Sequence, residues 1–227
     1  MRIRLPWITR TDRARWRAAR SIADLGHLTA LWLEGEVASH PSCATPNYGP
    51  DKETAHLVPI LAAANRAGYL TDNSQPGLIE RGSDGDLWEQ RAAVIGWIHR
   101  DNQQLVRCIT TAARDAGLLV CVDHPGSDIP VTKVDGQDYT IFGAVPPEYL
   151  RVLWSARLID RDLFTTLTNA ASITVVDPQY GRDSLLWPVL TKALAHHALV
   201  LPTGIRLEGT VFPASSCIDL PNATPQP

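Results

Sequence analysis

The chain has 227 residues, of which 44% are hydrophobic and 20% are charged, a composition typical of a globular protein with one domain. Its formal net charge of −3 argues against a general affinity for nucleic acid or acidic membranes. No apolar run approaches the ~20 residues that a membrane span needs. No signal-peptide core follows the N-terminal arginines, and the four cysteines form no CxxC pair. We therefore expect a reduced, cytoplasmic protein.

The first 20 residues are strongly basic, with seven arginines against one acid, Asp12. Such a segment is able to contact nucleic acid or an acidic partner. The alternative is a solvated helix or a frayed tail. We favour it because only Trp7 and Trp16 accompany the charge as aromatic side chains. We expect three parts: a basic arm (1–20), an α/β domain (21–198) and a partly disordered C-terminal extension (199–227).

Capping residues and glycines predict the first two helices of the domain. Ser21, followed three residues later by Asp24, is typical of a capped helix start. The second helix begins at Asp51 and contains Pro59, which should kink it unless its first turn starts late. Gly68 is expected to end this helix, because glycine adopts the left-handed backbone conformation at little cost.

A run of small polar side chains, from Thr71 to Pro76, directly follows the apolar pair Tyr69-Leu70. We interpret the pair as a short buried strand. In one interpretation the polar run places hydroxyls and amides at a strand end, where a ligand can meet them. In the other it is an ordinary connection with local side-chain turn bonding.

The remainder alternates strands with helices, which predicts an α/β (α+β) fold with a single mixed sheet and flanking helices. Asp135-Gly136 is a hairpin signal, so we expect strands on both sides of it. Asp101 and Asp160 are expected to cap helices, and Gly117 to end the first of these. Further strands are expected at 87–98, 118–122, 139–145 and 173–176, helices at 101–116, 146–154, 160–170 and 184–197, and a polar loop at 77–86.

The sequence lacks the common motifs of nucleotide binding, metal binding and catalysis: GxGxxG, the Walker loop, HExxH and GxSxG. The seven histidines do not occur at metal-ligand spacing. Asp123-His124, at a strand end, is an acid–base pair that we consider, although a surface loop is the stronger interpretation. These motifs therefore lead no further than an α/β domain.

Six short motifs, spread over residues 25 to 195, are informative because of their order. They are Leu31–Glu36, Glu53-Thr54, Asn65–Pro76, Gln90–Ala92, Thr140 with Gly143 and Pro146, and Val176-Asp177 with Asp183–Trp187. In this order they resemble the C-terminal regulatory domain of eukaryotic methylenetetrahydrofolate reductase, which binds S-adenosylmethionine. The chain is also similar to small stand-alone actinobacterial proteins. The resemblance implies the fold of that regulatory domain.

The resemblance also implies a ligand, S-adenosylmethionine or S-adenosylhomocysteine, and the residues that bind it. Matched motif by motif, those residues are Glu53, Thr54, Thr71, Ser74, Gln75 and Thr140. A carboxylate suits the cationic groups of the ligand, and helix-start amides and hydroxyls suit its carboxylate. Capping of the local backbone is the alternative role for the hydroxyls. The reductase barrel has no counterpart here, so we expect no reductase activity and no cofactor.

Three functions stay open from the sequence. The first is a stand-alone domain that senses an adenosyl metabolite and passes the signal to a protein partner, with a homodimer suggested by pairing in the resembled family. The second is an enzyme acting on an adenosyl or nucleoside substrate, with Glu53, Asp72 and His124 as its acids and bases. The third is a protein-interaction module whose pocket is filled by side chains such as Trp154 or Tyr69.

Overall fold

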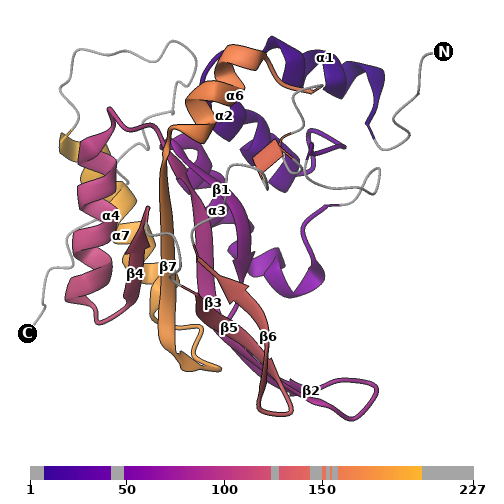
Figure 1. The fold of residues 1–227 in the computed structure, drawn as a ribbon, viewed down its shortest axis with the longest axis vertical. Helices are drawn as coiled ribbons and strands as arrows, with labels where there is room; N and C mark the ends of the chain where they lie inside the picture. The colour runs from indigo at the N-terminus through magenta and orange to yellow at the C-terminus, as the bar shows by residue number, and fades with distance from the viewer. Residues whose placement is uncertain are drawn as a thin grey trace, which may run out of the picture.

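The computed structural model describes residues 8–41, 49–123, 128–143, 150–151, 154 and 158–200 (Figure 1). Its helices are α1 (Arg10–Ala18), α2 (Ile22–Leu33), the 3-10 helix η1 (Lys52–Leu57), α3 (Val58–Arg66), α4 (Gln103–Asp115), α6 (Arg161–Thr168) and α7 (Leu186–Val200). Its strands are β1 (Tyr69–Gln75), β2 (Leu78–Arg81), β3 (Leu87–Ile98), β4 (Leu119–Val122), β5 (Ile129–Val134), β6 (Gln137–Phe142) and β7 (Ala171–Tyr180).

The long strand β3 is the centre of a seven-stranded sheet. The strand order is β4-β7-β3-β5-β6, and β1 and β2 also pair with β3. β1 and β7 pair with the C-terminal part of β3, whereas β2 and β5 pair with its N-terminal part. The predicted class, one sheet with flanking helices, is confirmed. We had expected strands of mixed direction, but every strand pair within the described residues is antiparallel. Two of these pairs, β2 with β3 and β5 with β6, are antiparallel because short hairpins join them.

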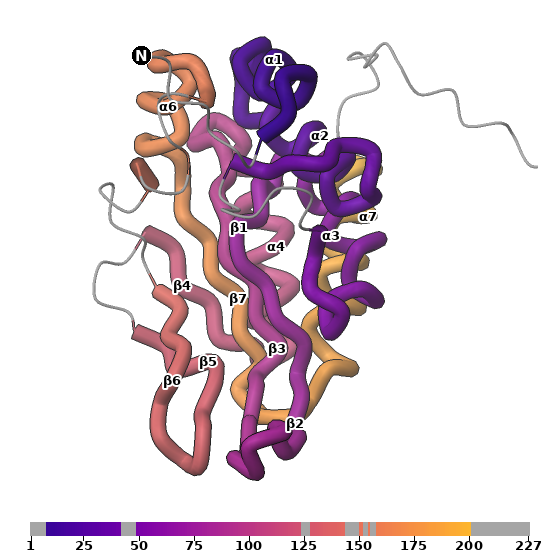
Figure 2. Tube along the Cα trace, turned by 90° about the vertical axis from the view of Figure 1, so that its right-hand side faces the viewer, coloured from indigo at the N-terminus to yellow at the C-terminus, as the bar shows by residue number. Residues whose placement is uncertain are grey.

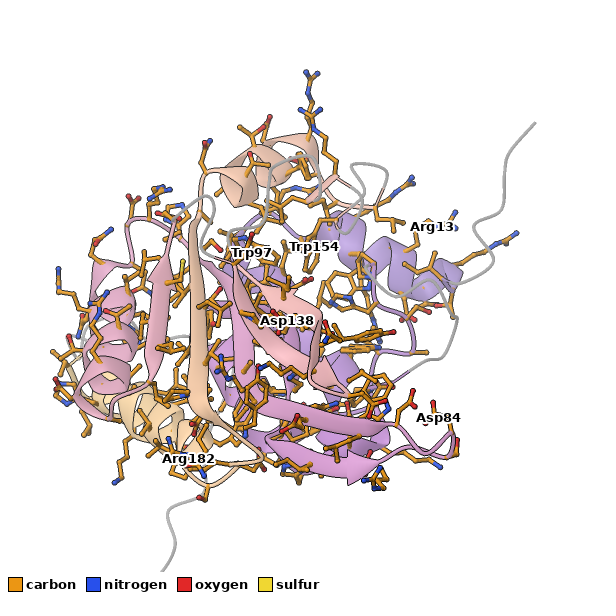
Figure 3. All side chains as sticks on the ribbon, turned by 60° about the horizontal axis from the view of Figure 1, so that its bottom comes forward. Arg13, Asp84, Trp97, Asp138, Trp154 and Arg182 are labelled. Atoms are coloured by element: carbon orange, nitrogen blue, oxygen red, sulfur yellow. The ribbon has the colours of Figure 1, made fainter. Side chains whose placement is uncertain are left out.

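Side chains of the sheet contribute to three hydrophobic clusters, two of which also include helices. Tyr69 belongs to a core with α3, α4 and α7, whereas the next residue, Leu70, belongs to a core with α1, α2 and α6. Figure 2 shows α3 and α7 along one side of the sheet and α1 and α6 beyond its end. Trp97 and Trp154 lie together in the second core (Figure 3). Packing on both sides therefore fixes the position of β1.

Several local signals give the structure that they predicted. Ser21 and Asp24 form a capping box at the start of α2. The helix after Asp51 does start late: η1 comes first, and Pro59 then lies in the first turn of α3, where a missing N–H costs nothing. Gly68, with φ of 98°, follows the end of α3. β3 has the predicted limits.

Other expectations need correction. The polar run from Thr71 does not follow a strand end, because β1 continues through Gln75. The expected loop at 77–86 contains β2, which pairs with β3. The cap of α4 is Asn102, whose side chain accepts a hydrogen bond from Leu105 N, and not Asp101. In the first two cases pairing with β3 supplies the backbone hydrogen bonds, so polar side chains do not prevent strand formation.

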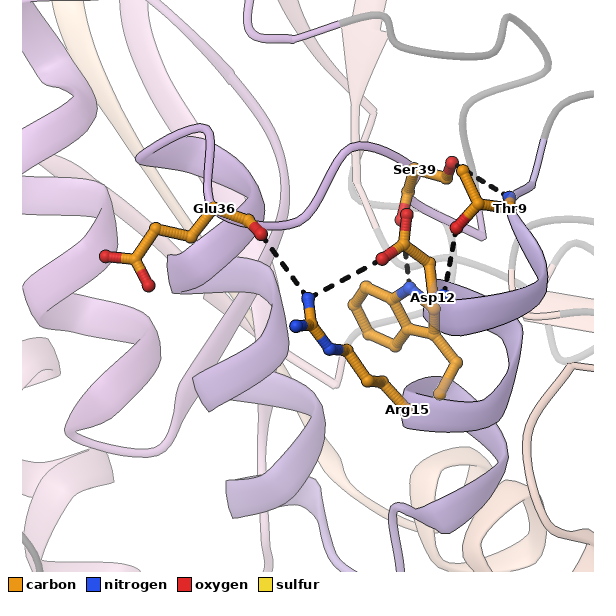
Figure 4. A network of polar contacts seen from close by, with 6 residues as sticks. Thr9, Asp12, Arg15, Glu36 and Ser39 are labelled. Carbon is orange, nitrogen blue, oxygen red and sulfur yellow. Dashed lines mark hydrogen bonds and ion pairs between the residues drawn. The ribbon is translucent and has the colours of Figure 1, made fainter.

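The N-terminal basic segment, expected as a solvated arm, is part of the packed domain from Ile8 onward. One face of α1 is buried, and Trp16 is 0% exposed and donates from Nε1 to Ser39 O at 2.9 Å. The other face carries arginines, among them Arg15, whose Nη1 donates to Glu36 O at 3.3 Å (Figure 4). A helix with one tryptophan-bearing face thus anchors the segment.

Some expectations fall on residues outside the described part of the chain. Most of the expected helix at 146–154 lies outside the described residues. His124 and the extension from residue 201 onward also lie outside them. Residues 199 and 200 belong to α7. None of the helices in the described part of the chain is long and apolar enough to cross a bilayer.

Candidate functional site

Glu53 lies on η1, which places its carboxylate against β3. The Gln90 side chain lies near this carboxylate. Partial burial and the negative charge of Asp51 raise the pKa of Glu53 above its ordinary value, as does the charge of Glu80, whereas the polar side chain of Gln90 acts in the opposite direction. Glu53 therefore holds its proton more readily than a free glutamic acid. A positive charge placed beside it would stabilise its carboxylate form.

A row of polar side chains runs across three strands from Gln90. Gln90 of β3 is directly opposite Thr132 of β5, which is directly opposite Thr140 of β6. Directly opposite residues point to the same face, with Cβ atoms roughly 5 Å apart. Gln90 Oε1 is buried and has no hydrogen-bond partner among the described residues. We call Glu53, Gln90, Thr132 and Thr140 the polar row.

An aromatic pair adjoins the polar row. Trp88 precedes Gln90 by two residues on β3, so both side chains point to the same face. Its ring meets that of Tyr139 edge to face, with centroids 5.1 Å apart. Tyr139 is 67% exposed and stands where the register between β5 and β6 shifts, immediately before Thr140. A flat aromatic surface is therefore accessible beside hydroxyls and a carboxylate.

Gln75, an expected ligand residue, makes structural hydrogen bonds. Its Nε2 donates to the carbonyl oxygens of Arg91 (3.0 Å) and Val131 (2.9 Å), and its Oε1 accepts from Thr132 Oγ1 at 3.0 Å. These bonds join the end of β1 to both β3 and β5. Gln75 thus holds Thr132 in place within the polar row.

Three other expected ligand residues, Thr54, Thr71 and Ser74, are not part of the polar row. Thr54 Oγ1 donates to Asp51 O at 2.8 Å, which caps its own turn. Thr71 is directly opposite Gly96 of β3, and Ser74 is opposite Val94. At about 3.3 Å per residue, those levels are roughly 20 Å and 13 Å along β3 from that of Gln90. The structure therefore brings Glu53 and Thr140 into one row and separates Thr71 from it.

Asp72 is a partly buried acid in β1, and among the three hypotheses only the enzyme uses it. It stands at the register shift between Thr71 and Asn73, so it has no directly opposite residue on β3. Burial raises its pKa to about 7. Its Oδ1 has no hydrogen-bond partner within the described ranges. Asp72 can therefore change its protonation state near neutral pH.

The last of the six motifs fixes η1 and hence Glu53. Asp183 accepts hydrogen bonds from Gly77 N (2.9 Å), from Trp187 Nε1 (2.7 Å) and from His56 Nε2 (2.8 Å). His56 follows Glu53 by three residues, which places both on one side of a 3-10 helix. These contacts lower the pKa of Asp183 despite its partial burial. The motif is therefore structural and positions the acid of the site.

Gln90 and Thr132 were not among the expected ligand residues. Gln90 did belong to the Gln90–Ala92 motif. The hairpin at Asp135-Gly136 predicts Tyr139 opposite Thr132, and only the register shift of the structure places Thr140 there. In the part of the chain that the structure describes, no cluster of His, Cys, Asp and Glu side chains could hold a metal ion. Cys108 and Cys121 are free thiols.

The structure is a small α+β domain with one antiparallel sheet, across which the polar row places two hydroxyls, an amide and a carboxylate. The chain belongs to the family described as Domain of unknown function (DUF6919), whose profile matches residues 11–197. This match begins within α1 and ends within α7. A comparison with curated proteins finds no match.

Proposed function

We propose that the protein is a stand-alone ligand-binding regulatory domain that recognises S-adenosylmethionine, S-adenosylhomocysteine or a related adenosyl metabolite, without reductase activity. The observation that supports this proposal is the polar row, which ends at the Glu53 carboxylate and is bordered by Trp88 and Tyr139. A cytoplasmic location, a homodimer and a protein partner that receives the signal belong to the same proposal.

Each part of the row suits one part of such a ligand. The Glu53 carboxylate matches the ammonium or sulfonium group, because a cation offsets the charges of Asp51 and Glu80. The hydroxyl of Thr140 and the unpartnered Oε1 of Gln90 suit the ribose hydroxyls. The exposed aromatic pair offers a face on which an adenine can stack. No group in this arrangement is a strong nucleophile, which favours binding over turnover.

Calorimetric titration with S-adenosylmethionine and S-adenosylhomocysteine tests the proposal. We expect heat with at least one ligand. Glu53→Gln should weaken binding at least tenfold, since a hydrogen bond to a charged group contributes about 1.5–3 kcal/mol, and Thr140→Val should weaken it about threefold to tenfold, since a neutral hydrogen bond contributes about 0.5–1.5 kcal/mol. Glu89→Gln is the matched control, because Glu89 neighbours Gln90 but points to the opposite face of β3. It should leave affinity unchanged.

The proposal fails if neither ligand gives heat at millimolar concentration. The site assignment fails if both variants of the polar row, Glu53→Gln and Thr140→Val, keep full affinity.

Asp72 supports a second candidate, an enzyme with an acid–base group near neutral pH, because burial raises its pKa to about 7. Chromatography of the ligand after incubation separates the two: unchanged ligand supports the regulatory domain, and a product that disappears in Asp72→Asn supports the enzyme.

A further inference from the structure

A second hollow lies away from the polar row, between α4 and α7, which run side by side at one edge of the molecule (Figure 1). Its volume is about 710 Å³, within the range of pockets that hold small organic molecules. Ala112 of α4 and Ala193 of α7 line it. Small side chains at these positions leave space between the helices that larger ones would fill. We call this hollow the α4–α7 groove.

The charged residues of the groove are predominantly basic. Arg107 and Lys192 are positive and Asp115 is negative. Arg107 and Gln104 are three residues apart on α4, so their side chains are neighbours on one face. Gln104 Nε2 is buried and has no hydrogen-bond partner in the described part of the chain. A buried N–H without an acceptor is unfavourable, and an anionic oxygen at this place would accept its hydrogen bond.

We propose that the α4–α7 groove binds an amphiphile with an anionic head group and an aliphatic body. The head group accepts from Gln104 Nε2 and pairs with Arg107, and the body lies along Ala112 and Ala193. From Gln104 to Asp115 the groove follows α4 for about 17 Å, the length of a medium-chain fatty acid. This site shares no residue with the polar row, so the proposal does not depend on whether an adenosyl ligand binds there.

Calorimetric titration of the full chain with laurate, below its micelle concentration, tests the proposal. We expect saturable binding at one site. Dodecylammonium has the same aliphatic body and the opposite charge, and should bind at least tenfold more weakly. Arg107→Glu should weaken laurate binding at least tenfold, and Ala112→Leu should weaken both probes because it fills the groove. Arg114→Glu makes the same charge change on α4 outside the groove lining and should leave binding unchanged.

Three outcomes overturn the proposal: no saturable heat with laurate, equal affinity for laurate and dodecylammonium, or equal losses for Arg107→Glu and Arg114→Glu. Both arginines are exposed, so neither substitution endangers folding, and circular dichroism spectra of the variants confirm this. Titration of Glu53→Gln with laurate keeps the two sites distinct. It should match wild type even if adenosyl ligands fail to bind.

Discussion

The Asn65 side chain holds Thr71 through both its backbone and its hydroxyl. Asn65 Nδ2 donates to Thr71 Oγ1 at 2.6 Å, and Asn65 Oδ1 accepts from Thr71 N at 3.1 Å. The same Nδ2 donates to Leu61 O at 2.9 Å, and Asn65 is 0% exposed. The pair therefore joins the end of α3 to the start of β1 across the turn at Gly68. This contact gives two conspicuous residues of the Asn65–Pro76 motif a structural role.

Asn65→Ala and Thr71→Val should destabilise the protein without weakening ligand binding at the polar row. Loss of the Asn65 side chain leaves buried groups unpaired, at a cost of about 2–4 kcal/mol, and Thr71→Val should cost about 1–3 kcal/mol. Urea denaturation measures both. Asn73→Ala, at an exposed position of the same strand, is the control and should change the free energy of unfolding by less than about 0.5 kcal/mol. A loss of adenosyl affinity in Thr71→Val at unchanged stability would contradict this role.

Elements whose signals are local were predictable from the sequence. The capping box of Ser21 and Asp24 needs only four residues, and the Asp135-Gly136 hairpin needs only its turn, where both residues have positive φ. α1 was not predictable as a packed helix, because Trp16 is buried against His40 and Trp154, which lie far away in the chain. Local pattern cannot show which distant side chains cover a face.

The candidate site was predictable only in part, for the same reason. Glu53 and Thr140 could be named from motifs, but their relation depends on the register that places Gln90, Thr132 and Thr140 in one row. The sequence shows that Gln75 has a side-chain amide, but it does not show whether this amide binds a ligand or two backbone carbonyls. Only the tertiary structure shows that it does the latter.

Asp177→Ala should be among the most destabilising single substitutions in the described domain. Asp177 is 0% exposed and accepts from Arg182 Nε at 2.8 Å and from Arg182 Nη2 at 2.7 Å, while Gln179 N donates to its Oδ1 at 2.8 Å. The Arg182 side chain is 32% exposed, so water can solvate its charge, and the main cost is the loss of the hydrogen bonds to the buried carboxylate, about 1.5–3 kcal/mol. Urea denaturation of Asp177→Ala measures this cost.

The matched control for Asp177→Ala is Asp101→Ala, because the Asp101 side chain is 93% exposed. This substitution should cost less than about 0.5 kcal/mol. Adding Arg182→Leu to Asp177→Ala should change the free energy of unfolding little further, because water solvates the partly exposed Arg182 once Asp177 is gone. A loss below about 1 kcal/mol in Asp177→Ala would show that the pair contributes little.

Acid should destabilise the protein through His40, which is 3% exposed among Trp16, Trp32 and Trp154. Burial lowers its pKa from 6.5 to about 3. Between these values the unfolded chain binds a proton that the folded chain does not, so the contribution of His40 to stability falls as pH falls below 6.5. This contribution should amount to about 2 kcal/mol between pH 7.5 and 5. Urea denaturation of wild type and of His40→Gln at the two pH values measures it as a difference, because Asp72 contributes with the opposite sign.

The substitution His40→Gln removes this titration, so the change in its free energy of unfolding from pH 7.5 to 5 should be about 2 kcal/mol more favourable than that of wild type, whatever its effect on stability at pH 7.5. His27→Gln is the control, because His27 lies exposed on α2 and its loss should leave the wild-type dependence in place. The assignment is wrong if His40→Gln and wild type lose equal stability on acidification.

Asp72 should act in the opposite direction, because burial raises its pKa from 3.8 to about 7. Between these values the folded protein holds a proton that the unfolded chain has released, so stability falls as pH rises and is constant above pH 7. Asp72→Asn removes the penalty, so its gain over wild type should be about 2–3 kcal/mol larger at pH 8 than at pH 5. Asp101→Asn should show no such difference, since that carboxylate is 93% exposed. If Asp72→Asn shifts the free energy of unfolding equally at both pH values, the carboxyl does not titrate near neutrality, and the enzyme hypothesis loses its acid–base group.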